Sequence, residues 1–297
     1  MACQYIEIMA KITRAQRASQ RSVQSRPRKS AKTRPARPPA RPNSSKSRAP
    51  KSKVPKPRSS KPRSSKPKAE KPKAEKPKAE KPKAQKPWTP EEVREAFERF
   101  RKANPEPKGE LEHLNPYTLL VAVVLSAQAT DAGVNKATRE LFKVADTPQK
   151  MLALGEDRLR DYIKTIGLYR NKAKNVIALS DKLIKDFGGE VPRTRAEIEQ
   201  LPGAGRKTAN VVLNMAYGEH TLAVDTHVFR VANRTGLAPG KTPLEVELGL
   251  EKVVPSEFMA HAHHWLILHG RYTCLARKPR CEVCLINDLC RWPEKTV

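Results

Sequence analysis

Glycine and aromatic residues are almost missing from the first 87 residues of this 297-residue chain. All 13 glycines lie beyond that point, and Tyr5 is the sole aromatic residue before it. Large apolar side chains are sparse there as well, so this part lacks the material from which a folded core is built. The whole sequence also lacks a run of about 18 apolar residues, which argues against a membrane-spanning helix.

This first part also contains few acidic residues. Residues 1–87 hold 28 Lys and Arg against 4 Asp and Glu, a net charge of +24. Residues 88–297 hold 31 against 27, a net charge of +4, with a normal apolar content. Most of the chain's charge of +28 therefore belongs to one segment. We predict a disordered Lys/Pro/Ala-rich tail over 1–87 and a folded part from Trp88 onward.

The tail carries a short repeat, because residues 66–85 read KPKAE three times and then KPKAQ. Proline at every fifth position prevents a continuous helix, and like charges extend the chain. A polycation of this density binds polyanions without regard to sequence and in a salt-dependent way. We favour contact with nucleic acid over the alternative of a plain solvated linker.

The folded part reads as a series of helices. Apolar residues recur at helical spacing from Leu159 to Ile166, ending at Gly167, and again from Val176 to Phe187, ending at Gly188. Residues 117–130 are apolar almost all round, which predicts a buried central helix. The one extended candidate is Thr221–Val224, so we predict an all-α fold. Further helices are expected at 90–103, 135–143, 195–201, 206–217, 227–235, 243–254 and 257–269.

A glycine-containing turn, PGAG at residues 202–205, joins two of these helices. Gly203 and Gly205 permit a tight backbone, and the second helix begins directly afterwards. The free N–H groups at that helix start, together with the positive end of its dipole, suit a DNA phosphate. A plain connection between helices is the alternative that the turn by itself leaves open.

Lys207 lies in the first turn of the second helix, where the dipole disfavours a positive charge. A neutral amine there is a nucleophile that can form a Schiff base. A phosphate contact or a solvated surface lysine is the commoner role of such a residue taken alone, so the chemistry requires a partner. A helix over 206–217 is about 18 Å long, and an extended segment 218–224 reaches about 23 Å. That segment can return Asp225 to the neighbourhood of Lys207. Helix capping is the other role open to Asp225, and the two are compatible.

Four of the five cysteines fall within 17 residues, at Cys274, Cys281, Cys284 and Cys290. Thiolates this close together indicate a metal centre rather than disulfides. The single CxxC departs from the paired knuckles of structural zinc, and four cysteines equally suit one [4Fe–4S] cluster. Basic residues surround the cysteines, which suggests binding to a DNA backbone: Arg271, Arg277, Lys278, Arg280 and Arg291. For the four histidines between His261 and His269 we favour packing over metal binding.

Taken together, these motifs resemble the endonuclease III family of DNA glycosylase/AP lyases. The resemblance covers about residues 90–297 and rests on several runs besides the four cysteines: VLSAQATD (124–131), TIGLYR (165–170), LPGAGRKTAN (201–210), AVDTHVFRVANR (223–234) and HHWLILHGR (263–271). It implies two helical domains, a helix-hairpin-helix barrel at 109–220 and a cluster domain formed by 88–108 with 221–297. It also implies one [4Fe–4S] cluster held by the four cysteines.

The resemblance further implies base excision repair of oxidised pyrimidines. On this view Lys207, activated by Asp225, displaces the damaged base as a Schiff base and cuts the strand by β-elimination. Gln128 and Leu168 would fill the gap left by the flipped nucleotide, with a helix-end hydrogen bond and core packing as their alternatives. Gly203, Gly205 and Arg206 of the hairpin would contact DNA.

Two related kinds of glycosylase and one module without activity are the alternatives to this function, and each resembles the chain less. The 8-oxoguanine glycosylases generally lack the cluster. Adenine glycosylases share the hairpin, the aspartate and the cluster but lack the lysine, whereas Lys207 is present. A silent DNA-binding module would need neither Lys207 nor Asp225. We expect a monomer that binds damaged or abasic double-stranded DNA and no membrane. We place it inside the cell in association with DNA, favouring a bacterial cytoplasm or nucleoid and leaving a nucleus or mitochondrion open.

Overall fold

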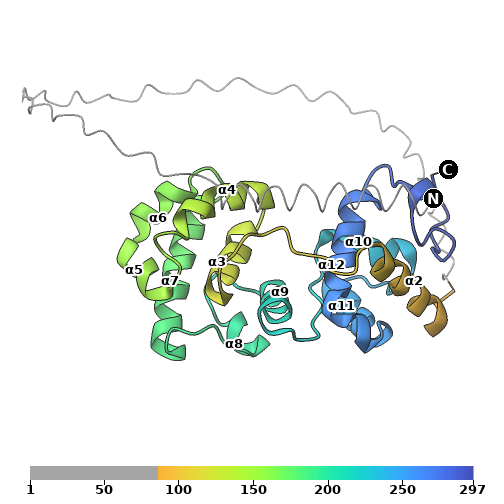
Figure 1. The fold of residues 1–297 in the computed structure, drawn as a ribbon, viewed down its shortest axis with the longest axis horizontal. Helices are drawn as coiled ribbons and strands as arrows, with labels where there is room; N and C mark the ends of the chain where they lie inside the picture. Colours follow the sequence, from red (N-terminus) through yellow and green to blue (C-terminus); the bar gives the residue numbers. More distant parts are fainter. Residues whose placement is uncertain (1–85, 297) are drawn as a thin grey trace, which may run out of the picture. The chain divides into compact units, whose positions relative to one another are not determined.

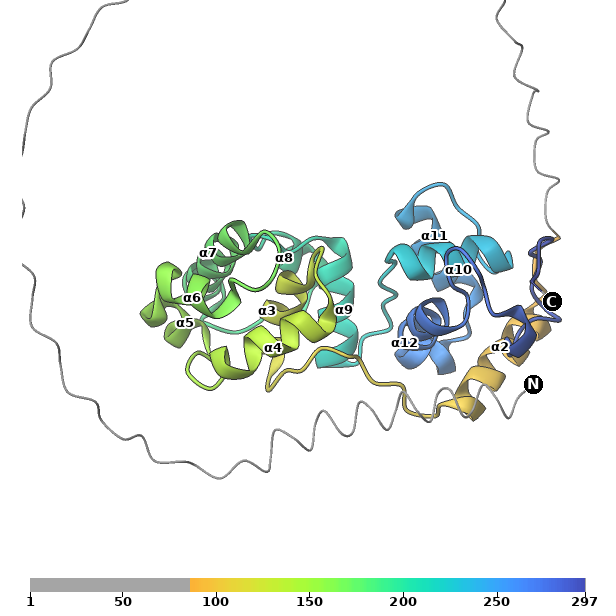
Figure 2. The same ribbon diagram turned by 90° about the horizontal axis from the view of Figure 1, so that it is seen from above.

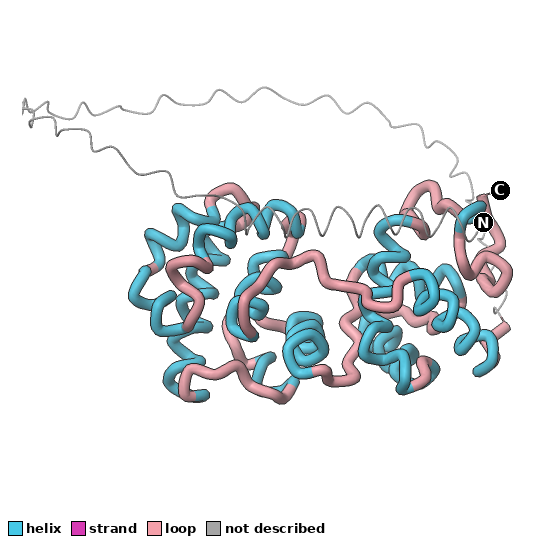
Figure 3. Tube along the Cα trace, viewed as in Figure 1, coloured by secondary structure: helices cyan, strands magenta, loops and turns pink. Residues whose placement is uncertain are grey.

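The structure is a computed structural model that describes residues 86–296. The tail expected at 1–87 lies almost entirely outside these residues. Within the described part the chain forms helices and no strand, which confirms the all-α fold (Figure 3). Figure 1 labels the helices, which are α2 (Pro90–Ala103), α3 (Pro116–Ser126), α4 (Asp131–Leu141), α5 (Pro148–Leu154), α6 (Glu156–Ile163), α7 (Tyr169–Phe187), α8 (Arg195–Glu199), α9 (Arg206–Tyr217), α10 (Thr226–Thr235), α11 (Pro243–Val253) and α12 (Ser256–Tyr272). The 3₁₀ turn η1 (Cys281–Val283) follows α12.

Capping residues explain where most of these helices begin. Thr89, Asn115, Thr147 and Thr242 each accept a backbone N–H and are each followed by proline at the first helical position. The same pattern reveals α5, which the periodicity of apolar residues did not predict. Helix α4 starts at Asp131, four residues earlier than expected, because Thr130 caps it.

A first hydrophobic core is formed by helices α3 to α9. Helix α3 lies at its centre, since nine of its eleven residues are buried, as the all-round apolar pattern predicted. It ends at Ser126 rather than at residue 130, because Ala127 leaves the helical region with ψ of 118° and Gln128 follows in a left-handed conformation with φ of 54°. Helices α7 and α9 pack against α3.

A second hydrophobic core is formed by α2 and α10 to α12. Phe97 stacks on Phe258 with ring centroids 5.6 Å apart, and both rings lie close to the buried Trp265. Helix α2 comes early in the chain but packs against α12, so the sequence leaves this core and returns to it (Figures 1 and 2).

Two connections join the cores, at residues 104–115 and 218–225. In the second connection Leu222 and Val224 belong to the second core, whereas Ala223 packs into the first. This alternation is that of an extended chain, although the segment forms no strand with any described residue. All the described residues lie within one compact unit of the chain. None of the helices over 86–296 is both long and apolar enough for a membrane crossing.

Candidate active site and cysteine site

The glycine turn between α8 and α9 has the geometry that its sequence predicts. Gly203 has φ of +81°, and a Cβ there would lie 3.0 Å from Asn175 and 3.2 Å from Val124. Both the backbone angle and the close approach require glycine. A Cβ on Gly205 would meet nothing within 4 Å, and no side chain caps α9 at this residue. The first N–H groups of α9 are thus open on the exposed side of the hairpin.

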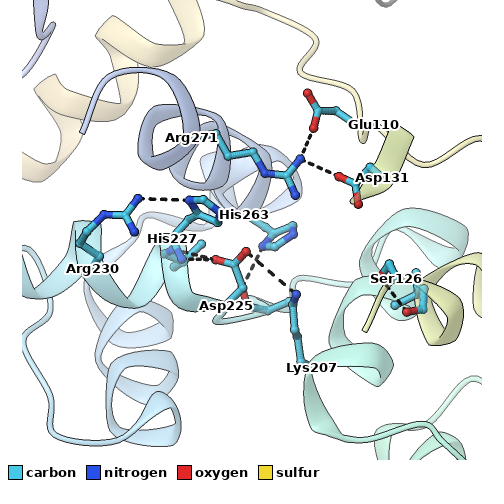
Figure 4. Close-up of polar contacts among 12 residues, drawn as sticks. Glu110, Ser126, Asp131, Lys207, Asp225, His227, Arg230, His263 and Arg271 are labelled. Carbon is cyan, nitrogen blue, oxygen red and sulfur yellow. Dashed lines mark hydrogen bonds and ion pairs between the residues drawn. The ribbon is translucent and has the colours of Figure 1, made fainter. Parts of the chain in front are cut away.

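The structure brings Lys207 and Asp225 together, as the length of the connecting segment allows. Lys207 Nζ lies 4.0 Å from Asp225 Oδ2 (Figure 4). The lysine side chain is 51% exposed and the aspartate side chain 9%. Asp225 also caps α10, because its Oδ1 accepts the backbone N–H groups of His227 and Val228 at 2.8 Å. One carboxylate oxygen is therefore fixed by the helix, and the other faces the amine.

Two histidines complete the surroundings of this pair. The buried ring of His263 bonds through Nδ1 to the carbonyl oxygen of Ala223 at 2.9 Å, which anchors the segment leading to Asp225. Burial lowers the pKa of His263, while Asp225 raises it and Lys207 lowers it. Burial likewise lowers the pKa of His227. Both imidazoles are consequently neutral near pH 7. The sequence offered no separate signal for His263 beyond its place in the HHWLILHGR run.

A cleft of about 1680 Å³ is lined by residues of the 104–115 connection and of helices α4, α9, α10 and α12. Its lining does not include Lys207 or Asp225, but it reaches His227, two residues beyond Asp225. Arg271 binds Glu110 and, at 2.7 Å, Asp131 (Figure 4). Tyr272 donates its hydroxyl to Glu110 at 2.5 Å. This network ties the 104–115 connection to α4 and α12.

Gln128 and Leu168 share an unusual conformation. They are the two non-glycine residues in the described chain with positive φ, at 54° and 58°. Leu168 is 56% exposed, which excludes core packing as its role, and Gln128 is exposed as well. Their loops are neighbours, since a Cβ on Gly167 would lie 3.9 Å from the Gln128 carbonyl oxygen. Strained, exposed residues of this kind gather at functional sites.

Arg206 has a partner inside the protein. Its Nε lies 2.9 Å and 3.1 Å from the two carboxylate oxygens of Glu247, and its terminal nitrogen lies 2.8 Å from one of them. The side chain is also partly exposed, so it could still reach DNA. The expected DNA contact of Arg206 stays a prediction.

The four cysteines lie around one small cavity and form no disulfide. Burial raises the pKa of Cys284 to about 12 and also raises that of Cys290. Thiolates at such positions need a cationic partner, which a metal centre supplies. No group of three or more His, Cys, Asp or Glu side chains within 86–296 has its donor atoms set for a metal ion. The four thiols around one cavity are nevertheless the kind and number of donors that a [4Fe–4S] cluster takes.

The histidines of α12 pack, as expected. His263, His264 and His269 are buried, and His269 lies edge-on against Phe100 with ring centroids 5.3 Å apart. Of the basic residues near the cysteines, Arg271 and Arg291 bind carboxylates, the latter that of Glu92 at 2.5 Å. These carboxylates compete with DNA phosphates for the two arginines, whose expected contact with DNA stays a prediction. Exposed basic side chains remain at Arg277, Lys278 and Arg280.

Comparison with known proteins agrees with this geometry. Residues 121–256 match the family model of the HhH-GPD superfamily of base excision DNA repair proteins. Residues 274–290 match the iron–sulfur binding domain of endonuclease III. The hairpin and the Lys207–Asp225 pair lie in the first match, and the four cysteines lie in the second.

Similar proteins narrow this class to one family. Endonuclease III of Haemophilus influenzae is 60% identical over 201 residues, 68% of this chain and 95% of that protein. Endonuclease III of Escherichia coli is 59% identical over the same shares. A solved structure described as a trapped endonuclease III–DNA covalent intermediate matches with a TM-score of 0.65 and 47% identity, covering 69% of this chain and 96% of that one. The chain belongs to the endonuclease III family, and its cofactor is one [4Fe–4S] cluster.

Proposed function

We propose that this protein is a bifunctional DNA glycosylase and AP lyase of base excision repair that acts on oxidised pyrimidines. The observation that carries the proposal is the 4.0 Å separation between Lys207 Nζ and Asp225 Oδ2, at the starts of two helices from different cores. Binding DNA requires no such pair, whereas amine chemistry requires a nucleophile with a carboxylate beside it.

The chemistry of Lys207 is that of a primary amine, which attacks through its nitrogen lone pair. The amine adds to the anomeric C1′ of the damaged nucleotide, and the bond between C1′ and the base breaks, so that the base leaves with its electron pair. The departing base takes up one amine proton, and the second proton goes to the ring oxygen O4′ as the C1′–O4′ bond breaks, which leaves a C1′=N Schiff base. The Schiff base acidifies the 2′ proton, and loss of that proton breaks the C3′–O bond and releases the 3′ phosphate. Asp225 stabilises the positive charge that develops on the amine and the sugar.

The DNA must present its sugar to Lys207, which requires the damaged nucleotide to leave the base stack. The exposed, neighbouring loops at Gln128 and Leu168 are suited to fill the vacated space, because both side chains project from a left-handed backbone. The open N–H groups around Gly203 and Gly205 are suited to hold a phosphate nearby.

The cysteine site contributes to the DNA surface. Cys274, Cys281, Cys284 and Cys290 would hold the cluster, which when bound cross-links the loop between them. That loop carries the exposed Arg277, Lys278 and Arg280, whose charges suit the DNA backbone. We infer that the protein acts as a monomer on double-stranded DNA inside the cell. The basic tail, outside the described residues, would add sequence-independent affinity.

Borohydride trapping tests the proposal. Wild-type protein should be trapped covalently on DNA with an abasic site and on DNA with an oxidised pyrimidine such as thymine glycol. Lys207→Gln should abolish trapping yet keep binding, whereas the control Lys252→Gln, an exposed lysine of α11, should be trapped as wild type is. Asp225→Asn should keep the helix cap, because asparagine caps equally well, and slow trapping by about 10²–10⁴-fold. A wild-type protein that neither traps nor cleaves, or a trapped Lys207→Gln variant, would refute the proposal.

A further inference from the structure

Glu247 is a buried carboxylate that the chemistry above leaves unused. It lies on α11 and is 3% exposed, between Val246 and Leu250, which are buried in the second core. Its guanidinium partners both come from outside that core. Arg206, on α9, makes the close contacts at 2.8–3.1 Å, and Arg195, on α8, lies 3.8 Å away.

One carboxylate therefore ties both helices of the hairpin to α11. The neighbouring turn of α11 adds a weaker link, because Glu251 lies 3.5 Å from Arg195. A buried carboxylate that is matched to an arginine fork fixes both distance and angle, since the planar fork accepts few other geometries. This junction joins helices that pack with the first core to a helix of the second core.

The junction between Glu247 and Arg206 is linked to both residues of the Lys207–Asp225 pair. Arg206 and Lys207 are the first two residues of α9, so whatever fixes Arg206 also fixes the backbone that carries Lys207. Asp225 caps α10, and α10 packs against α11, the helix that carries Glu247. The path from Lys207 to Asp225 therefore closes through Arg206, Glu247, α11 and α10. Each connection along it is a covalent bond, an ion pair or a packed helix contact.

We propose that Glu247 is a positioning residue, which holds Arg206 so that the start of α9 presents Lys207 to Asp225. The proposal deepens the function proposed above and rests on it. Lys207 has a long and half-exposed side chain, so the 4.0 Å separation from Asp225 depends on where the helix start is held. A displacement of about 1 Å at reacting groups can cost on the order of 100-fold in rate.

Arg206 has two possible roles, contact with DNA and positioning of Lys207, and these predict different effects when it is replaced. A DNA contact would chiefly affect binding, because a phosphate contact contributes to affinity before any chemistry. A positioning role would chiefly affect the rate at saturating DNA, because bound DNA then meets a displaced amine.

The experiment measures two quantities on the full-length holoprotein. One is the single-turnover rate of borohydride trapping at saturating abasic-site DNA. The other is the affinity for duplex containing tetrahydrofuran, which lacks the reactive aldehyde. Glu247→Gln and Arg206→Gln should each lower the rate at least about tenfold while the affinity changes less than about threefold. The double variant should be no slower than the slower single variant, because both changes break one link.

The matched control is Glu257→Gln, which removes a Glu–Arg pair, that with Arg94, joining two helices of the second core alone. It should trap at the wild-type rate. Because Arg206 is partly exposed, Arg206→Gln keeps the test available if Glu247→Gln does not fold. Unchanged rates in both variants, loss of affinity without loss of rate, or additive losses in the double variant would overturn the proposal. Failure of the wild-type protein to trap would instead overturn the proposed function.

Discussion

The two cores of this protein are held together by different means. The first is almost entirely a matter of helix packing, with α3 buried on all sides by aliphatic neighbours. The second encloses an aromatic centre of Phe97, Phe258 and Trp265, and ends in a stretch, 273–296, whose one helical element is the turn η1. Arginine side chains hold this stretch through its carbonyl groups, since Arg234 bonds to Leu275 and Ala276 and Arg99 to Leu285.

This difference shows what each core depends on. The first core requires close packing, because apolar burial is its chief source of stability. The second core requires hydrogen-bond partners for an irregular backbone. It also requires a partner for four buried or half-buried thiols. Since the reactive lysine comes from the first and its aspartate from the second, activity depends on both.

The largest effect should come from removing a cluster ligand. Cys284→Ser should abolish most of the visible absorption and iron content, because three cysteines are left for a four-ligand cluster. Hydrogen exchange should then lose protection at 273–296 and keep it at 116–217, where the first core is independent of the cluster. Cys3→Ser is the control and should keep the iron. Equal loss of protection in both regions would remove the distinction between the cores.

The next largest effect should come from lowering the pH, which should also destabilise the second core. In the described chain the buried histidines all lie on α12, and burial lowers the pKa of His263 and lowers that of His264 to about 3. In the unfolded chain these histidines bind protons near pH 6.5, whereas in the folded protein they stay neutral to a lower pH. The free energy of unfolding is therefore undiminished above pH 6.5 and decreases as the pH falls toward 3. The slope approaches about 1.4 kcal/mol per pH unit for each histidine.

Urea unfolding between pH 7 and pH 5 measures this slope. His264→Gln should reduce the slope, whereas the control His113→Gln changes an exposed histidine and should leave it unaltered. A slope that is insensitive to His264→Gln would contradict the assignment.

The smallest effect should distinguish the two glycines of the hairpin. Gly203→Ala should lower the free energy of unfolding by about 1–3 kcal/mol, because φ is +81° and Val124 of the first core lies in the way. Gly205→Ala should cost less than about 1 kcal/mol, because its Cβ would enter open space at φ of −120°. Thermal unfolding with parallel visible absorption checks both. Similar losses in the two variants, or loss of the cluster in either, would contradict the proposal that the hairpin packs as part of the first core.

Much of this arrangement was predictable from local signals. Capping threonines and prolines mark helix starts, the glycine turn marks the hairpin, and the cysteine spacing marks the metal centre. The errors are local too. Helix α5 is too short to show an apolar period, and the apolar pattern of α3 continues to residue 130 although the backbone at Gln128 is left-handed. The carboxylate partners of Arg271 could not be foreseen, since Glu110 and Asp131 lie 140 or more residues away, and its expected contact with DNA stays a prediction.

The sequence by itself determined the helical class, the family and the kinds of chemical group available, because these depend on periodicity, capping and motif spacing along the chain. It also allowed Asp225 to reach Lys207, because chain length limits distance. The tertiary structure alone decided the 4.0 Å approach of these two groups, the exposure of Leu168 and the pairing of Arg206 with Glu247. The physical reason is that ion pairs and packing contacts form between residues 18 to 161 positions apart, and nothing in the local sequence encodes the partner.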